Sequence, residues 1–458
     1  MQKKERIHCI GIGGIGMNGV AQILFDKGSQ VTGSDIEDSP ILEDMRKKGI
    51  KIFIGHNEDY ITKDIAKIIY TSAIPENNPE LVKAKKIGIP VFTFAQAVKA
   101  ISDNLYTIAV CGTHGKTTIT GMCAVALLAG DKDPTVIIGS KINEFGGASY
   151  RVGNGKYFLV EACEYKRNFL NFDPDIIIMS NIEADHLDYF KDIEDYKNAY
   201  KEFISKLPND GFLITNADDK NVRDVIKDYK GSLILFSEKD KNCEWFIQDN
   251  QIYKNGEKAG ELLLNVPGDF NRLNALCAVI LGQILNIERE KLLAALSSYK
   301  GAWRRFEYIG DFMGIKLISD YAHHPTAITK TLSAAKQKFN DQKICVIYQP
   351  HQFNRTRHFI NEFSESLKIA DICIIPNIYK VRDTAEDFKK ISAADLVELI
   401  NKKGGHAKLI SEYEDIREFL IQKRKEIDII IIMGAGDIWL FGDYLLKNHD
   451  LKCSVCED

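Results

Sequence analysis

Short apolar runs alternate with helical patterns along the whole chain, and this alternation is the strongest constraint on its fold. Runs such as residues 106–111 and 315–320 have the length of strands, and longer stretches with apolar residues at helical spacing separate them. Strands joined by helices pair in parallel, so the pattern predicts an α/β fold with parallel sheets. Residues 245–264 differ: they look antiparallel, with Asn255-Gly256 as a hairpin turn.

Two polar breaks divide this pattern into three parts. They are Ser102-Asp103-Asn104 and Tyr299-Lys300-Gly301. A chain of 458 residues also fits about three domains, at roughly 150 residues each. We therefore predict three α/β domains, over residues 1–104, 105–301 and 302–458.

The composition argues against several classes of function. The 60 Lys and Arg residues are balanced by 64 Asp and Glu residues, so the chain lacks the basic surplus of a nucleic-acid-binding protein. Apolar stretches such as residues 429–433 are far shorter than the ~20 residues that span a bilayer. The basic start at residues 1–6 leads into a run broken by glycines, without the cleavage pattern of a signal peptide. We expect a cytoplasmic protein that neither inserts into a membrane nor binds nucleic acid.

Most of the ten cysteines lie in apolar runs, where a free thiol packs as a small apolar side chain. Cys453 and Cys456 form a lone CxxC pair in the last residues. Without a second pair or nearby histidines, this pair is weak evidence for zinc, and a frayed tail is the alternative. The cysteine usage fits a reducing compartment.

The first glycine-rich motif lies directly between a predicted strand and the helical pattern that follows it. It contains Gly11, Gly13, Gly14 and Gly16. Glycines let the backbone approach a diphosphate, and the N–H groups at the helix start bind it. Asp35, beyond the second predicted strand, is placed to accept hydrogen bonds from ribose hydroxyls. The motif predicts a site for a nucleotide with a diphosphate. NAD is the simplest candidate, and a tight turn without a ligand is the alternative.

A second loop, residues 112–118, reads Gly-Thr-His-Gly-Lys-Thr-Thr and also joins a strand to a helix. We call it the phosphate loop. Its backbone N–H groups would cradle phosphates, Lys116 would reach the β- and γ-phosphates, and Thr117 could bind Mg²⁺. The loop is shorter than the general Gly-x4-Gly-Lys-Thr pattern, and a chance Gly-Lys-Thr-Thr after a strand is the alternative. Two nucleotide sites in consecutive domains suggest that one nucleotide supplies energy and the other is a handle on the substrate.

Further motifs follow these two in a characteristic order. They are Gly33-Ser34-Asp35, Thr71-Ser72-Ala73-Ile74-Pro75, Glu161-Ala162-Cys163-Glu164, Asn181-Ile182-Glu183-Ala184-Asp185-His186, Arg304-Arg305-Phe306-Glu307, Asp320-Tyr321-Ala322-His323-His324-Pro325-Thr326, Gln349-Pro350-His351 and Gly434-Ala435-Gly436-Asp437. With them the chain resembles, over essentially its whole length, the Mur ligases, the ATP-dependent amide-forming enzymes of peptidoglycan precursor synthesis. The match is closest to the branch that joins L-alanine to UDP-N-acetylmuramate through an acyl phosphate.

The resemblance implies a Rossmann-like UDP-binding domain, a central P-loop ATPase domain, and a C-terminal Rossmann-like domain that binds the amino acid. The first glycine motif would then bind a UDP-sugar and not NAD. The residues implied for the UDP-sugar are Gly11, Gly13, Gly14, Gly16, Met17, Ser34, Asp35, His56 and Ser72. Those implied for ATP are Gly112, Thr113, His114, Gly115, Lys116, Thr117, Thr118, Asn271, Asn274, Arg304 and Asp320.

The resemblance also implies which residues hold Mg²⁺, contact the amino acid and carry catalysis. Those implied for Mg²⁺ are Thr117, Glu161 and His186. Those implied for the amino-acid side are Tyr321, His323, His351 and Arg355. The implied catalytic residues are Lys116, Glu161, His186, His323 and Arg355.

The chain departs from the family pattern at places that bear on ligands. Phe270 replaces a histidine of the adenine segment, which would exchange a polar contact for apolar stacking. Gln352 replaces an arginine, which removes one cation from the amino-acid side. The acidic segment after Glu161 is here residues 163–166, Cys-Glu-Tyr-Lys. Other Mur ligases carry a carbamylated lysine where this chain has Tyr200, an absence typical of the alanine-adding branch.

Three alternatives stay open at this point. A UDP-N-acetylmuramate–tripeptide recycling ligase is the nearest, although Gln349-Pro350-His351 favours the alanine branch. The first glycine motif alone would permit a nicotinamide-dependent oxidoreductase with an accessory ATPase. A non-catalytic sensor of the nucleotide sugar is disfavoured because Lys116 and Glu161 are retained. We expect a monomer or a homodimer.

Overall fold

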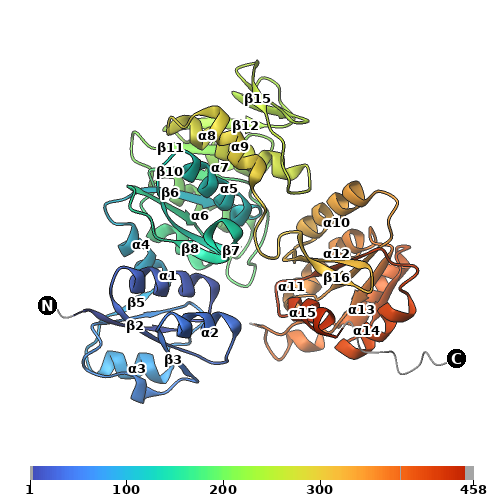
Figure 1. Cartoon of the computed structure of the whole chain (residues 1–458), viewed down its shortest axis with the longest axis horizontal. Helices are drawn as coiled ribbons and strands as arrows, with labels where there is room; N and C mark the ends of the chain where they lie inside the picture. Colours follow the sequence, from blue (N-terminus) through green and yellow to red (C-terminus); the bar gives the residue numbers. More distant parts are fainter. Residues whose placement is uncertain (1–3, 382, 449–458) are drawn as a thin grey trace. The chain divides into compact units, whose positions relative to one another are not determined.

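The computed structural model describes residues 4–381 and 383–448, and its strands form three sheets. The chain divides into two compact units. One is the part up to Leu263 with Leu273–Lys300, and the other is Leu264–Arg272 with the part from Gly301 on. The first unit holds the first two sheets and the second unit holds the third, as the chain colours in Figure 1 show. The predicted α/β fold with three domains and parallel sheets is confirmed.

The first sheet has five parallel strands in the order β3-β2-β1-β4-β5. The strands are β1 (Arg6–Ile10), β2 (Gln30–Asp35), β3 (Lys51–Ile54), β4 (Lys67–Tyr70) and β5 (Val91–Thr93), and the helices are α1 (Ile15–Asp26), α2 (Pro40–Lys47), α3 (Pro79–Lys86) and α4 (Phe94–Ser102), with the short η1 (Glu58–Tyr60). The strand order reverses between β1 and β4, which is where open α/β sheets bind ligands. Both faces are covered: Val20 of α1 packs in one apolar cluster and Leu81 of α3 in another.

The central sheet has the order β15-β14-β13-β12-β11-β10-β6-β9-β7-β8. Its strands are β6 (Tyr106–Cys111), β7 (Thr135–Ile142), β8 (Ala148–Arg151), β9 (Tyr157–Glu161), β10 (Ile176–Met179), β11 (Phe212–Asn216), β12 (Ser232–Ser237), β13 (Trp245–Gln248), β14 (Gln251–Lys254) and β15 (Glu257–Glu261). The inner strands are parallel, and antiparallel pairs close both ends. The predicted hairpin at Asn255-Gly256 is confirmed, because both residues have positive φ (51° and 81°), as a two-residue type I′ turn requires.

Helices of the central domain flank this sheet. They are α5 (Lys116–Ala129), α6 (Ile193–Ile204), α7 (Lys220–Ile226), α8 (Phe270–Ile284) and α9 (Arg289–Ser298), with η2 (Asn143–Phe145) and η3 (Tyr165–Asn171). Apolar residues recur at helical spacing over residues 270–285, and this segment forms α8. β7, β8 and β12 were not predicted from the sequence.

The third sheet has the order β16-β17-β21-β18-β19-β20, with only β16 antiparallel. The strands are β16 (Glu307–Phe312), β17 (Ile315–Asp320), β18 (Ile344–Tyr348), β19 (Ile372–Ile375), β20 (Ala407–Leu409) and β21 (Ile429–Met433). The helices are α10 (Pro325–Phe339), α11 (Phe353–His358), α12 (Ile360–Leu367), α13 (Ala393–Lys402), α14 (Tyr413–Gln422) and α15 (Trp439–Lys447), with the short η4 (Asp387–Lys389). One apolar cluster lies on each face of the sheet.

All eight cysteines within residues 4–381 and 383–448 are free, and seven of them are buried, as the apolar runs predict. Cys163 is exposed. Cys453 and Cys456 lie outside the described residues. Within the described part of the chain, no helix combines the length and the apolar character needed to cross a bilayer.

Candidate functional site

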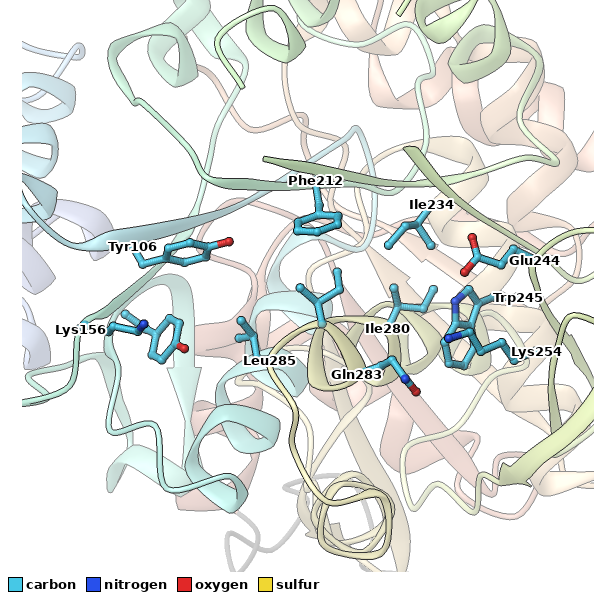
Figure 2. Close-up of a pocket in the computed structure, with 12 residues that line it drawn as sticks. Tyr106, Lys156, Phe212, Ile234, Glu244, Trp245, Lys254, Ile280, Gln283 and Leu285 are labelled. Carbon is cyan, nitrogen blue, oxygen red and sulfur yellow. The ribbon is translucent and has the colours of Figure 1, made fainter. Parts of the chain in front are cut away.

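One pocket of about 390 Å³ lies at the amino ends of central strands (Figure 2). Tyr106 and Tyr157, which line it, begin β6 and β9, whereas the phosphate loop follows the other end of β6. Trp245 adds apolar surface, and Lys254 Nζ lies 5.2 Å from the centre of its ring. Parallel α/β sheets bind ligands at the carboxyl ends of their strands, so we expect the chemistry at the opposite edge.

The phosphate loop connects β6 to α5 between the ends of the neighbouring strands β9 and β10. Asn181, just after β10, holds the loop, because its side-chain oxygen accepts a hydrogen bond from the N–H of His114 (2.9 Å). Gly112 has a φ of +126°, and a Cβ at this position would lie 2.1 Å from Ser180 Oγ. The loop therefore has one backbone path, which requires glycine at position 112.

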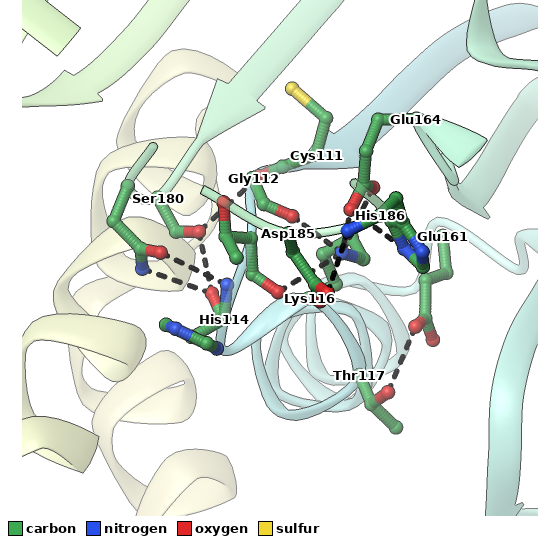
Figure 3. A network of polar contacts seen from close by, with 12 residues as sticks. Cys111, Gly112, His114, Lys116, Thr117, Glu161, Glu164, Ser180, Asp185 and His186 are labelled. Carbon is green, nitrogen blue, oxygen red and sulfur yellow. Dashed lines mark hydrogen bonds and ion pairs between the residues drawn. The ribbon is translucent and has the colours of Figure 1, made fainter. Parts of the chain in front are cut away.

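Lys116, the first residue of α5, bends back over the loop (Figure 3). Its Nζ donates to the carbonyl oxygens of Gly112 and Thr113, and the two oxygens of Glu164 lie 3.0 and 3.1 Å from it. The Glu164 side chain is 1% exposed and that of Lys116 is 14% exposed. Burial alone would lower the pKa of Lys116, but the Glu164 carboxylate outweighs burial and raises the pKa above its usual value. The ammonium group is therefore charged at neutral pH.

Two buried tyrosines of α6 support the Glu164 carboxylate. The hydroxyl of Tyr200 donates to that of Tyr196 (3.3 Å), which donates to Glu164 Oε1 (3.0 Å). Burial and the nearby Glu164 carboxylate raise the pKa of both phenols, so both stay protonated. Lys201 is exposed whereas Tyr200 is buried, so of these two neighbouring side chains it is Tyr200 that lies behind the site, one hydrogen bond from the residue that contacts Glu164.

Thr117 and Glu161 are brought together beside the phosphate loop. Thr117 Oγ1 donates to Glu161 Oε1 (2.9 Å), and the N–H of Gly139 donates to Glu161 Oε2 (2.6 Å). Hydroxyl and carboxylate oxygens are the donors that Mg²⁺ prefers, so this pair fits a magnesium ion beside bound phosphates. His186 Nε2 lies 3.6 Å from Glu164 Oε1, which places this predicted metal ligand beside Glu164.

Other residues predicted for ATP also meet at the loop. His114 Nε2 lies 2.8 Å from a carboxylate oxygen of Glu183. Asn274 of α8 lies against the loop, because its Oδ1 would be 2.9 Å from a Cβ on Gly115. Thr118 is half-buried in the first turn of α5.

Asn271 and Phe270 belong to the second compact unit. Asn271 Nδ2 donates to the carbonyl oxygen of Pro267 (2.6 Å). The ring centre of Phe270 lies 5.9 Å from Nζ of Lys330 on α10. The aromatic ring that replaces the family's histidine thus faces a cation.

Arg304 and Asp320, both predicted for ATP, are buried within the third domain. Arg304 is 4% exposed and donates to the carbonyl oxygen of Gly434, and burial lowers its pKa to about 10. Asp320 is 6% exposed and accepts from the N–H groups of Phe306 (2.8 Å) and Ala322 (2.7 Å). Burial raises the pKa of Asp320. Both side chains bind the backbone of their own domain.

The four residues predicted for the amino-acid side gather at the carboxyl edge of the third sheet. The ring centres of Tyr321 and His323 are 5.2 Å apart, and those of His323 and His351 are 6.2 Å apart. Arg355 of α11 has a guanidinium nitrogen 3.4 Å from His351 Nδ1. Tyr379, which the sequence analysis did not identify, stacks on His351 with ring centres 5.5 Å apart and planes 12° apart.

Gln352 is the residue directly before α11; it has a φ of +72° and is 6% exposed. Its N–H donates to the carbonyl oxygen of Tyr379 (3.1 Å), and the N–H of Tyr379 donates to that of Pro350 (2.8 Å). These bonds tie the segment after β18 to the segment after β19. Gln352, which stands where the family pattern has an arginine, is therefore buried between these two segments.

The first glycine motif forms the turn between β1 and α1 at the carboxyl edge of the first sheet. The N–H of Gly13 donates to Asp35 Oδ2 (2.7 Å), so this carboxylate holds the turn itself. Ser72 is exposed after β4, and its carbonyl oxygen accepts from Lys166 Nζ (3.2 Å). Met17 is 1% exposed, and its side chain packs in the core.

Ser34 and His56 both meet the carboxylate of Glu80, which sequence reasoning missed. Asn78-Pro79-Glu80 reads as a helix start, with a capping residue, a proline and an acid in the first turn, and this local role hid the longer contacts. Glu164 was quoted within a motif but given no role. Its contact with Lys116 spans 48 residues, so no local signal in the sequence marked it.

Three family models match the chain in order. They are described as the Mur ligase family catalytic domain (residues 6–106), the Mur ligase middle domain (residues 110–282) and the Mur ligase glutamate ligase domain (residues 304–436). Together they span all three sheets.

Full-length relatives agree with these matches. The chain is 41% identical over 460 residues to a UDP-N-acetylmuramate–L-alanine ligase of Acetivibrio thermocellus, covering 98% of this chain and 97% of the relative. It is 40% identical over 451 residues to the protein of the same name from Clostridium novyi, covering 97% of each.

Solved structures give the same answer. A UDP-N-acetylmuramate-alanine ligase from Thermotoga maritima superposes with a TM-score of 0.81 at 27% identity, over 97% of this chain and 99% of the other. A murein peptide ligase from Psychrobacter arcticus shares the fold, with a TM-score of 0.74 at 24% identity over 98% of this chain and 100% of the other. The domain order, the phosphate loop and the full-length relatives together establish that the chain belongs to the Mur ligase family.

Proposed function

We propose that this chain joins L-alanine to the lactyl carboxylate of UDP-N-acetylmuramate, with conversion of ATP to ADP and phosphate. The phosphate loop carries the proposal, with Lys116 charged above it and the Thr117–Glu161 pair beside it. The full-length relatives that bear the name of this reaction support the choice of substrates.

The reaction follows from the chemistry of the carboxylate. A carboxylate is a poor electrophile because its leaving group would be oxide. Transfer of the γ-phosphoryl group of ATP to a carboxylate oxygen gives an acyl phosphate and ADP. The amine nitrogen of L-alanine then attacks the carbonyl carbon, and the tetrahedral intermediate releases phosphate and a proton to leave the amide. Each step concentrates negative charge, so cations and oriented N–H groups are expected to dominate catalysis.

The residues of the phosphate loop would bind and orient ATP. The loop N–H groups and the Lys116 ammonium would meet the phosphate oxygens. Thr117 and Glu161 would hold Mg²⁺, with His186 and Glu161 on a second ion, and bound Mg²⁺ would neutralise charge on the phosphates. His323 and Arg355 would orient L-alanine, with Tyr321 and His351 beside them.

We propose the domain boundaries 1–104, 105–301 and 302–458, with the UDP-sugar, ATP and the amino acid assigned to them in that order. The first glycine motif and Asp35 would bind the diphosphate and ribose of the UDP-sugar. A cytoplasmic location and a monomer or homodimer stay predictions.

The test is phosphate release by the purified protein. Phosphate should appear only when ATP, Mg²⁺, UDP-N-acetylmuramate and L-alanine are all present. Release with a tripeptide but not with L-alanine would instead identify a recycling ligase. Oxidation of NADH without any need for ATP would contradict the proposal as a whole.

A further inference from the structure

Glu80 is a fully buried carboxylate in the first domain that the proposed mechanism does not use. It lies in the first turn of α3 and is 0% exposed. Ionised carboxylates are almost never fully buried unless they are paired or hydrogen-bonded, because burial removes their hydration. The residues that donate hydrogen bonds to Glu80 therefore indicate the role of this carboxylate.

The first sheet brings three polar side chains to the face on which Glu80 lies. His8 on β1 is paired in register with Thr32 on β2, and Ser34 follows Thr32 by two residues. Because side chains alternate along a strand, these residues point to the same side of the sheet. His56 comes just after β3, the next strand outward, at the same carboxyl edge.

Three of these side chains, those of His8, Ser34 and His56, meet at the Glu80 carboxylate. His8 Nε2 lies 2.7 Å from Oε2, and His56 Nδ1 lies 2.7 Å from Oε1. The hydroxyl of Ser34 donates to both oxygens, at 2.8 and 2.9 Å. Three donors and the positive end of α3 compensate the burial of this charge. The carboxylate oxygens of Glu80 are therefore already saturated by protein groups.

The contact has a direct consequence for His56. An ionised carboxylate only accepts hydrogen bonds, so the proton on the His56 ring must sit on Nδ1. Nε2 is then the ring nitrogen left for a ligand, and the side chain is 18% exposed while that of Glu80 is 0% exposed. A ring fixed by one buried bond meets a ligand in a single orientation, which reduces the entropy lost on binding.

We propose that Glu80 is a positioning residue of the nucleoside-diphosphate site, and that it holds His56 with Nε2 directed to the UDP-sugar. The inference rests on the proposed function for the identity of this ligand. The hydroxyl of Ser34 donates to Glu80, so Ser34 helps to hold this carboxylate in place and is not available to bind the ligand through the same proton. His8, bonded to Thr32 Oγ1 (2.8 Å) on its other nitrogen, fixes Glu80 from behind.

The first experiment measures the proton on His56 without any substitution in the network. Nitrogen-15 spectra of the histidine rings in the wild-type protein, with the His56 signals assigned from a His56→Gln sample, should show Nδ1 protonated. An unprotonated Nδ1 in the wild-type protein would overturn the inference. This measurement requires neither activity nor substrate.

The second experiment measures binding by calorimetry in Glu80→Gln, with the exposed Glu76→Gln as the matched control. The dissociation constant for UDP-N-acetylmuramate should rise about tenfold or more in Glu80→Gln, because the amide lacks the charge and turns an NH2 group toward donors that now bind an oxygen. The dissociation constant for ATP should stay unchanged, and the control should leave both constants unchanged.

The outcomes separate the inference from the proposed function. Unchanged binding of the UDP-sugar in a folded Glu80→Gln protein overturns the inference alone. An equal loss of ATP binding also overturns it, because that result indicates general unfolding. Failure of the wild-type protein to bind UDP-N-acetylmuramate overturns the proposed function as well.

Discussion

The ion pair between Lys116 and Glu164 predicts that ATP rescues a destabilised variant. Glu164→Gln keeps the shape of the side chain but removes the charge that compensates the buried ammonium. Breaking a buried pair on one side costs about 3–5 kcal/mol. Lys116 keeps its bonds to two loop carbonyls and is 14% exposed, so we expect the lower end, about 3 kcal/mol. At about 2 °C per kcal/mol, the melting temperature of this unit should fall by about 6 °C.

ATP should then stabilise the variant more than the wild-type protein. In the wild-type protein, the phosphates must compete with Glu164 for the Lys116 ammonium, whereas in Glu164→Gln they would meet an ammonium that lacks a carboxylate partner. The rise in melting temperature on adding ATP and Mg²⁺ should therefore be larger in the variant. Ligand-linked stabilisation of this kind follows directly from the difference in affinity.

Differential scanning calorimetry with and without ATP measures both effects. Glu183→Gln is the matched control, because Glu183 also pairs with a loop residue but its side chain is 40% exposed. We expect the control to change stability by less than about 1 kcal/mol. An equal ATP-induced rise in Glu164→Gln and the wild-type protein would refute the exchange of Lys116 between Glu164 and phosphate.

Three further substitutions test other parts of the site. Gly112→Ala should destabilise the phosphate loop by about 2 kcal/mol or more, measured by chemical denaturation, because its Cβ would overlap Ser180 Oγ; wild-type stability would contradict this. Glu161→Gln should weaken Mn²⁺ binding measured by electron paramagnetic resonance, and an unchanged affinity would exclude Glu161 as a ligand. Tyr379→Ala should raise KM for L-alanine several-fold while leaving KM for ATP unchanged, because it removes the ring stacked on His351; an equal change in both constants would contradict a role on the amino-acid side.

Local patterns in the sequence were enough to predict much of the fold. Tyr106–Cys111 and Ile315–Asp320 are observed as strands at the predicted residues, because their apolar side chains are the ones that the sheet buries. β12 was missed although its residues 233–236 form a continuous apolar run, so the signal for this strand was present in the sequence. In β7, Gly139-Ser140 interrupts the apolar run, so the strand has no clear local signal.

In the candidate site, too, features formed by neighbouring residues were predicted and contacts between distant residues were not. The phosphate loop could be recognised because its residues are adjacent in sequence. Glu80 and Glu164 could not be assigned, because their partners lie far away: His8 is separated from Glu80 by 72 residues and Lys116 from Glu164 by 48. A buried carboxylate has no pattern of its own, since its partners are visible only once the sheets have formed. Tyr379 was missed for the same reason, as it follows a different strand from His351.

The hydrogen-bonded pair of Tyr200 and Tyr196 has a consequence for the conditions under which the protein works. A lysine at position 200 would have to react with dissolved carbon dioxide before it could supply a negative group. A phenol forms no such carbamate. Tyr200 donates to Tyr196, which donates to Glu164, and the negative charge of Glu164 is encoded in the chain. The charge beside the phosphate loop is thus set at translation, and its presence does not depend on the gas dissolved around the protein.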